Sequence, residues 1–330
     1  MEIREQILHL FSDDSPFSFE DVAISVFRYQ ATHNLTYKAY LNAIGVNVEY
    51  IKCLEQIPLA PISFFKNHSI TSGQWNTERI FLSSGSGGDR SAHHIKDLEW
   101  YEDISLKIIG QRGYDIANTT VLALLPSYLE NGDSSLVHMV SHFSKLSQTN
   151  EAFYLYNFTD LYHRLMNLLS QSVQPILLIG VTFALIDFAN TYKIDSDQLR
   201  ICFTGGMKNR RREMTFDEVK QQLGDGFPSS RIFSEYGMTE LLSQSYSDET
   251  GYFIMPPSCR IIIKEINDPF SACKIGKTGQ VGLIDLANID TLSFILSDDL
   301  GRLIDRDHFE ILGRLTNSDL RGCTLLYNPS

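Results

Sequence analysis

The sequence contains few cysteines and few basic residues. Its five cysteines include no C-x-x-C pair, and their odd number argues against a disulfide framework or a zinc site. We therefore expect a cytoplasmic protein whose cysteines stay reduced. Lys and Arg together number 28 against 40 Asp and Glu, so the formal net charge is −12. This acidic balance argues against nucleic acid as a partner.

Long hydrophobic runs are also missing. The longest apolar stretch, 176–189, contains Thr182 and Asp187 and falls short of the ~20 residues that span a bilayer. Residues 1–6 lack the basic start of a signal peptide, and no long apolar run follows them. We therefore expect no membrane span and no export signal. The composition is that of an ordinary globular protein, with 43% hydrophobic and 21% charged residues.

Alternating apolar runs and helical patterns predict an α/β fold with a parallel sheet. The expected strands of this sheet are 80–82, 121–125, 176–179, 199–203 and 231–233. The expected helices between them are 94–109, 134–143 (capped by Asp133 or Ser134), 183–192 and 213–223. Residues 1–75 favour helices, and strands at 260–266, 280–286 and 292–296 predict a small β lobe after residue 250.

Four expected strands end in polar or glycine-rich loops, and ligands of open parallel sheets bind at such strand ends. In the first loop, glycines let backbone N–H groups converge on a polyphosphate, and hydroxyls add donors. Its residues are Ser83, Ser84, Gly85, Ser86, Gly87 and Gly88. No lysine follows directly, so this is not a P-loop, and the alternative is an ordinary surface loop.

The second loop, 204–208, places Gly205 and Gly206 directly after a strand. Adjacent glycines let a flat ring or a phosphate approach the backbone closely. Three arginines follow at 210–212, and for these we favour a solvated basic start of a helix.

The third loop, 234–240, offers a carboxylate that can hold Mg²⁺ through one oxygen, and an aromatic ring that can stack on a base. The fourth, 296–302, contains Asp298 and Asp299, and paired carboxylates can bind vicinal hydroxyls. The alternatives are an ordinary exposed loop for the third and an Asx turn capped by Gly301 for the fourth.

Taken in this order, the loops resemble the adenylate-forming superfamily of acyl- and aryl-CoA ligases. Residues 81–88 are similar to its Ser/Thr/Gly-rich phosphate loop, and 236–240 form an intact YGxTE motif. Three further segments match in order: 276–281 its G-x-x-G-E-L turn, 297–300 its T-G-D-L motif, and 313–314 the G-R before its hinge. Ordered matches over residues 80–322 are more specific than any single motif.

Within the superfamily, the chain most resembles the LuxE-type acyl-protein synthetases, which activate fatty acids in bacterial luminescence operons. The segments that carry this likeness are 124–130 with 134–136, 178–185 and 318–323. The resemblance implies four parts: a helical N-terminal segment (1–75), an α/β nucleotide- and acyl-binding core (76–255), a β-rich lobe (256–312) and a hinge-like C-terminal tail (313–330).

The resemblance also implies roles for single residues. Glu240 would hold Mg²⁺ beside the phosphates of ATP, which the loop 83–88 would bind. Gly205 and Gly206 would lie against the adenine, and Asp299 would hold the ribose hydroxyls. From the YGxTE motif, Tyr236 would stack on the adenine, with Gly237 and Thr239 beside it. The acid substrate would be a carboxylic acid, most simply a fatty acid.

The sequence departs from the superfamily pattern at its C-terminal end. A full-length ligase has roughly another hundred residues after the hinge, the size of a small domain, including a lysine that serves adenylation. Thr316 stands where many relatives have the hinge aspartate. We therefore expect most of the C-terminal domain to be missing, and Lys208, Arg302 or Arg314 to replace the lysine.

The likeness to acyl-protein synthetases implies that Cys323 accepts the acyl group and passes it to a partner reductase or acyltransferase. Arg321 beside it would lower the pKa of the thiol. The other cysteines, Cys53, Cys202, Cys259 and Cys273, are interpreted as packing residues.

Some histidines are candidates as well. His93 and His94 follow the first loop and could touch phosphate or the acyl carboxylate. His138 and His142 have metal-ligand spacing, but without a third ligand nearby in sequence we interpret them as structural. Two other functions stay open for the chain: a CoA ligase using a diffusible or carrier-protein thiol, and a decayed nucleotide-binding partner subunit.

Overall fold

The computed structural model describes residues 2–83, 90–126, 133–205 and 214–315. The chain forms two compact units, which are treated separately. The first contains residues 1–77, 93–96 and 255–330, and the second contains 78–92 and 97–254. Within the described residues, every helix is too short or too polar to cross a membrane.

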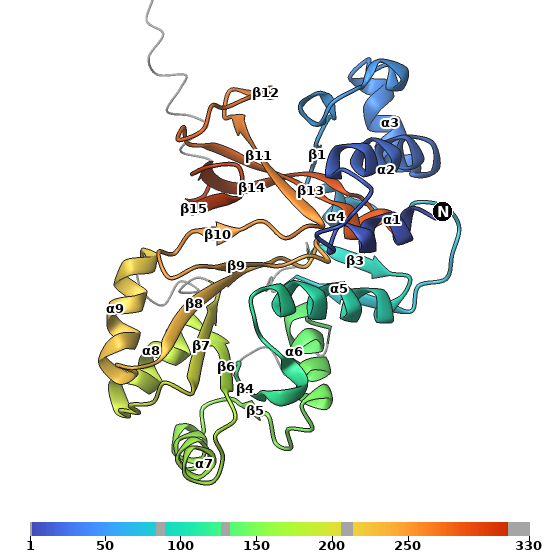
Figure 1. The fold of residues 1–330 in the computed structure, drawn as a ribbon. Coiled ribbons are helices and arrows are strands. Elements are labelled where there is room, and N and C mark those ends of the chain that lie inside the picture. The colour runs from blue at the N-terminus through green and yellow to red at the C-terminus, as the bar shows by residue number, and fades with distance from the viewer. Residues whose placement is uncertain (1, 84–89, 127–132, 206–213, 316–330) are drawn as a thin grey trace, which may run out of the picture. The chain divides into compact units, whose positions relative to one another are not determined.

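The second unit is a doubly covered, mostly parallel sheet (Figure 1). Its strands run in the order β10-β9-β8-β7-β6-β4-β5, and β4 to β8 are mutually parallel. Their bounds are β4 (Thr120–Leu124), β5 (Phe153–Tyr154), β6 (Ile176–Val181), β7 (Leu199–Thr204), β8 (Arg231–Tyr236), β9 (Ser245–Ser247) and β10 (Phe253–Ile254). All six residues of β6 are buried, as expected for a strand covered on both faces.

Helices cover both faces of this sheet. Figure 1 shows α5 and α6 on one face and α8 and α9 on the other. The helices are α5 (Leu98–Gln111), α6 (Ser135–Leu146), α7 (Phe158–Gln171), α8 (Thr182–Thr191) and α9 (Phe216–Gly226). Gly226 permits close packing of α8 and α9, because a Cβ there would lie 2.6 Å from the Cβ of Ala189. The parallel α/β arrangement predicted for 121–125, 176–179, 199–203 and 231–233 is confirmed. The strand expected at 80–82 forms as β2 (Arg79–Leu82), but it belongs to a separate two-stranded sheet, so its place in the parallel sheet was wrong.

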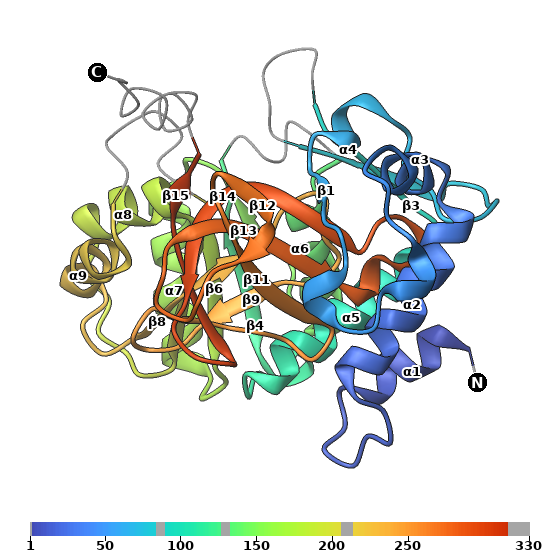
Figure 2. The same ribbon diagram turned by 90° about the horizontal axis from the view of Figure 1, so that it is seen from above.

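The first unit joins N-terminal helices to a mainly antiparallel sheet (Figure 2). Its helices are α1 (Ile3–His9), α2 (Phe19–His33), α3 (Leu35–Ala43) and α4 (Phe64–Asn67). The sheet has the order β12-β11-β13-β14-β15, with β1 paired parallel to β14. These strands are β1 (Ala60–Pro61), β11 (Cys259–Glu265), β12 (Asp268–Ala272), β13 (Gly279–Asp285), β14 (Phe294–Leu303) and β15 (His308–Arg314).

Aromatic packing and one buried amide attach α2 to this unit. The ring of Phe27 meets that of Phe294 edge-on, with centroids 5.8 Å apart, and Tyr37 stacks on Phe294 at 6.0 Å. Gln30 is fully buried, and its Nε2 donates to the carbonyls of Asn288 and Ile289 at 3.0 Å. A buried amide must find such partners, so Gln30 fixes the position of α2 along the segment 286–290.

Three sequence-based element boundaries are wrong. A helix was expected to begin at His94, but His94 lies in β3 (Ala92–Ile95) and α5 begins only after Asp97, whose side chain accepts the N–H of Trp100. β8 continues to Tyr236 rather than ending at Phe233. β14 continues through Asp298 and Asp299 to Leu303, because β13 and β15 supply its backbone partners on both sides.

Candidate active site

The first candidate loop begins where β2 (Arg79–Leu82) ends. The N–H of Ser83 donates to the carbonyl of Ser91 at 3.0 Å, and the N–H of Ser91 donates to the Ser83 hydroxyl at 2.9 Å. These two bonds hold Ser83 and Ser91, on either side of the loop, next to each other. Residues Ser84, Gly85, Ser86, Gly87 and Gly88 lie outside the described residues.

The second candidate loop starts at the end of β7. Gly205 has a positive φ of 67°, and a Cβ there would meet no atom of the described residues within 4 Å. The hydroxyl of Thr182, at the start of α8, donates to the carbonyl of Gly205 at 2.6 Å and fixes this turn. An open, bare backbone at a strand end can accept a flat ring. Gly206 and Lys208 lie outside the described residues.

The third candidate loop follows β8 on the neighbouring strand. Thr204 pairs in register with Glu235, so Gly205 and Tyr236 emerge at the same edge of the sheet. This is the edge at which the carboxyl ends of β6, β7 and β8 meet. Within the second unit, the structure therefore brings together the first residues of two of the four predicted loops.

Tyr236, Thr239 and Glu240 are all held by neighbouring groups. The Tyr236 ring lies 5.6 Å from that of Phe253, measured between centroids. Glu240 is 6% exposed, and the N–H of Leu241 donates to the carbonyl of Met238 at 3.1 Å, which forms a turn around it. A carboxylate in such a turn fits a hard cation such as Mg²⁺, which prefers oxygen ligands and needs few from the protein.

Glu235 is a buried acid that the sequence analysis included in the loop without giving it a role. Its carboxylate accepts a short hydrogen bond from the Thr204 hydroxyl, and the residue is 8% exposed. Burial raises the pKa of this carboxyl to about 7, although the bond from Thr204 opposes the rise. No pattern in the sequence singles it out, because its hydrogen-bond partner Thr204 lies 31 residues earlier in the chain.

Because the pKa of Glu235 is raised, we expect the free energy of unfolding to depend on pH. The folded protein holds this proton more tightly than the unfolded chain, whose carboxyl has the ordinary value of 4.5. This stabilisation is complete below pH 4.5 and disappears as the pH rises to about 7. Relative to Glu235→Gln, the wild type should lose about 3 kcal/mol of unfolding free energy over this range. Urea unfolding at pH 5 and pH 8 tests this, and equal losses in both proteins would contradict it.

Asp299 and Arg314 belong to the first unit, where they pair across β14 and β15. The Nε of Arg314 donates to Asp299 Oδ1 at 3.2 Å, and the Asp299 side chain is 10% exposed against 80% for Arg314. The expected loop and Asx turn at this point are wrong. Gly301 does not cap a turn but lies in the strand, where a Cβ would meet the carbonyl oxygen of Glu310 at 2.5 Å.

The other candidate cations and thiols that the structure describes include Arg302, Cys202 and Cys259. Arg302 Nε donates to Glu310 at 2.7 Å, so its charge already has a carboxylate partner. Cys202 and Cys259 are buried, and burial raises the pKa of both thiols well above the ordinary value. These two match the packing interpretation. Cys323, with Arg321 beside it, lies outside the described residues.

The histidines take part in structural contacts in this structure. His93 is fully buried, with Nε2 2.9 Å from the Thr291 hydroxyl. His138 and His142 both contact the carboxylate of Glu102, at 2.8 and 3.2 Å. No group of three or more His, Cys, Asp or Glu among the described residues could hold a metal ion. The contacts of His138 and His142 with Glu102 agree with the structural interpretation of the pair.

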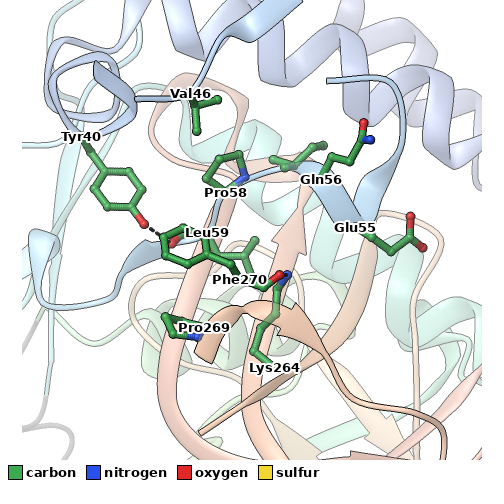
Figure 3. A pocket seen from close by; sticks show the side chains of 10 residues that line it. Tyr40, Val46, Glu55, Gln56, Pro58, Leu59, Lys264, Pro269 and Phe270 are labelled. Carbon is green, nitrogen blue, oxygen red and sulfur yellow. Dashed lines mark hydrogen bonds between the residues drawn. The ribbon is translucent and has the colours of Figure 1, made fainter. Parts of the chain in front are cut away.

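A pocket of about 270 Å³ lies in the first unit (Figure 3). Tyr40, Pro58, Leu59, Lys264 and Phe270 are among the residues around it. Lys264 Nζ donates to the carbonyl of Phe270 at 3.2 Å, and burial lowers the pKa of its ammonium. None of the residues nominated from the sequence lines this pocket.

Comparison by sequence finds no matching protein family and no matching curated protein. Comparison by structure finds 2-hydroxyisobutyryl-CoA ligase, solved with 2-HIB-AMP and CoA, at a TM-score of 0.65 and 13% identity, covering 90% of this chain and 75% of that one. The chain has the fold of these adenylate-forming ligases.

Two further structures have the same fold. A luciferase-like enzyme from the mealworm Zophobas morio matches at a TM-score of 0.53 and 15% identity, covering 82% of this chain and 62% of that one. O-succinylbenzoate coenzyme A synthetase from Bacillus subtilis, solved with AMP, matches at a TM-score of 0.53 and 15% identity. The match covers 74% of this chain and 50% of that one. The fold that the loop motifs implied is confirmed.

Proposed function

We propose that this protein is an ATP-dependent ligase that activates a carboxylic acid as acyl-AMP and passes the acyl group to a thiol. The observation that carries this proposal is the pairing of two motifs at adjacent strand ends. Gly205 directly follows β7, and the YGxTE motif begins at the last residue of β8, at the same sheet edge. Structural neighbours with bound acyl-AMP or AMP support this interpretation.

In the first half-reaction, a carboxylate oxygen attacks the α-phosphorus of ATP, and the bond to the bridging oxygen breaks to release pyrophosphate. A carboxylate is a weak nucleophile, so the site must align the reactants and neutralise charge. The loop at 83–88 would hold the phosphates, and Glu240 would hold the metal. Bound Mg²⁺ would supply positive charge to the phosphate oxygens. Gly205, Gly206 and Tyr236 would hold the adenine, with Gly237 and Thr239 beside it.

In the second half-reaction, a thiolate attacks the acyl carbon, and AMP leaves with the electron pair of the broken C–O bond. We propose an acyl-protein synthetase of the LuxE type, in which Cys323 is the thiol and the acid is a fatty acid. A partner reductase or acyltransferase would then take the acyl group. Lys208, Arg302 or Arg314 would take the role of the adenylation lysine of the ligases. Both arginines already have a carboxylate partner, Glu310 for Arg302 and Asp299 for Arg314.

A CoA ligase is the second candidate, because one structural neighbour is a CoA ligase with CoA bound. The two candidate enzymes differ in the molecule that carries the acyl group at the end of the reaction. The protein is incubated with ATP, Mg²⁺ and a radiolabelled fatty acid, with and without CoA. Label retained on the protein without CoA supports the synthetase, whereas label found only in acyl-CoA supports the ligase.

Asp299 should affect ATP binding more than the chemical step. Ribose contacts are much the same in the ground and transition states, so their loss raises KM first. Each lost hydrogen bond to a charged group is worth about 1.5–3 kcal/mol, so Asp299→Ala should raise KM for ATP at least about tenfold. Asp298→Ala is the matched control, because Asp298 is the adjacent aspartate and its side chain is exposed. Unchanged KM in Asp299→Ala, measured by exchange kinetics, would remove Asp299 from the ribose site.

A further inference from the structure

The carboxyl group of Glu235 connects the two strand ends of the candidate site. Thr204, the last residue of β7, donates its hydroxyl to Glu235 near the end of β8, and the two residues are opposite each other in the sheet. The other carboxyl oxygen lies against the backbone of Gly237, since a Cβ on that glycine would be 2.3 Å from Glu235 Oε1. The acid therefore touches both strands and the start of the YGxTE turn.

The same connection extends to a third element. The hydroxyl of Thr182, at the start of α8, donates to the carbonyls of Thr204 and Gly205, at 3.3 and 2.6 Å. Thr182, Thr204 and Glu235 are all less than a tenth exposed. A buried chain of satisfied hydrogen bonds fixes one geometry, because an alternative geometry would leave polar atoms unpaired.

Within the part of the chain that the structure describes, the titratable groups coupled to Glu235 carry no positive charge. Among the described residues, those coupled to it electrostatically are Cys202 of β7, Tyr101 of α5 and Tyr246 of β9, all of them buried. The pKa of each of these groups is raised, so all three are neutral near pH 7. An ionised carboxylate would thus be buried without a cation among these groups, which is costly. The neutral acid is the form that suits this environment.

We propose that Glu235 is a positioning residue of the nucleotide site, which sets the separation between the Gly205 turn and the loop Tyr236–Glu240. This inference rests on the proposed function, because it takes those two loops as the adenine site. Glu235 acts through the loops on either side of it.

The proposal has a pH signature. If the protonated form holds the binding geometry, the apparent affinity for ATP falls with the fraction of that form. That fraction drops tenfold for each pH unit above the pKa of Glu235, which is about 7. The apparent Kd for ATP should therefore rise about tenfold between pH 6 and pH 8. Glu235→Gln keeps an acceptor for Thr204 and never ionises, so its affinity should not show this rise.

The first measurement is ATP–Mg²⁺ binding by calorimetry at pH 6, 7 and 8, with KM and kcat for exchange at the same values. Ionisation of ATP itself affects all proteins equally, and Glu249→Gln, an exposed acid in the same unit, is the control. We expect the wild type and Glu249→Gln to lose affinity for ATP as the pH rises, whereas Glu235→Gln keeps its affinity. In the first two proteins, KM for ATP should change with pH and kcat should not. The same pH dependence in Glu235→Gln would overturn the proposal.

A second measurement works without ATP and separates this proposal from the proposed function. Amide hydrogen exchange of Gly205 and Tyr236 in the free protein, corrected for the intrinsic pH effect, reports the order of the two strand ends. Protection should fall between pH 6 and 8 in the wild type and stay constant in Glu235→Gln. Absence of ATP binding at every pH would contradict the proposed function, whereas equal protection profiles in both proteins would contradict the role of Glu235.

Discussion

In the Glu240→Gln variant, ATP–pyrophosphate exchange should fall by a factor on the order of 10² to 10³. Glu240 lies in the turn after β8 and is 6% exposed, so its carboxylate has a fixed position. The amide is almost the same size but lacks the negative charge that attracts a cation. Removing one preorganised electrostatic group from a water-poor site typically has an effect of this size.

The measurement is the initial rate of exchange at saturating ATP and acid, with Glu249→Gln as the matched control. Glu249 is an exposed glutamate of the same unit, so this change removes the same charge at a place where no role is proposed. Urea unfolding shows whether each variant is folded. A folded Glu240→Gln protein that exchanges at nearly the wild-type rate would exclude Glu240 as a metal-binding residue.

The Cys323→Ser variant should lose all covalent labelling and keep exchange. Acyl phosphates are strong acyl donors, so a thiolate needs only proximity and some activation to accept the acyl group. With ATP, Mg²⁺ and labelled fatty acid, the wild-type protein should retain label that neutral hydroxylamine releases, as a thioester does. Adenylation precedes transfer, so pyrophosphate exchange should continue in the variant.

Cys273→Ser is the matched control for this experiment, because Cys273 is a partly exposed cysteine for which no role in the reaction is proposed. It should be labelled like the wild type. Label that survives in Cys323→Ser would assign the thioester to another residue. Exchange without any labelling of the wild type would point to a diffusible acceptor such as CoA, and Cys323 would then have no part in the reaction.

The parallel sheet could be predicted from the sequence because its strands are buried on both faces. Such strands appear as unbroken apolar runs, and 121–125 and 176–179 correspond closely to β4 and β6. The helix cap at Ser134 was predictable for a similar local reason, since its hydroxyl accepts the N–H of Val137 at 3.4 Å. Local patterns were sufficient wherever burial or capping decided the structure.

Sequence reasoning failed where pairing between distant segments decides the structure. Asp298 and Asp299 are typical of a turn, yet both lie in β14, where Asp299 pairs with Arg314 of β15. His94 begins an apparent helical pattern, but it lies in β3. Glu235 showed no motif role, because its importance comes from Thr204, 31 residues earlier in the chain.

The candidate site was predictable only as a set of motifs. The ordered motifs identified Gly205, Tyr236 and Glu240, and the register of β7 and β8 explains why the first two emerge at one sheet edge. The proposed roles of Lys208 and Cys323 remain predictions from the resemblance, since both lie outside the described residues. Glu235 could be recognised only from its burial and its hydrogen bond.

The most direct test of the account is ATP–pyrophosphate exchange by the purified protein with a panel of carboxylic acids. Exchange requires only that acyl-AMP forms reversibly, so it does not depend on which thiol accepts the acyl group. The account predicts exchange that needs Mg²⁺ and is strong with at least one acid, such as a fatty acid. A folded protein that binds ATP and yet shows no exchange with any acid of the panel would contradict the account.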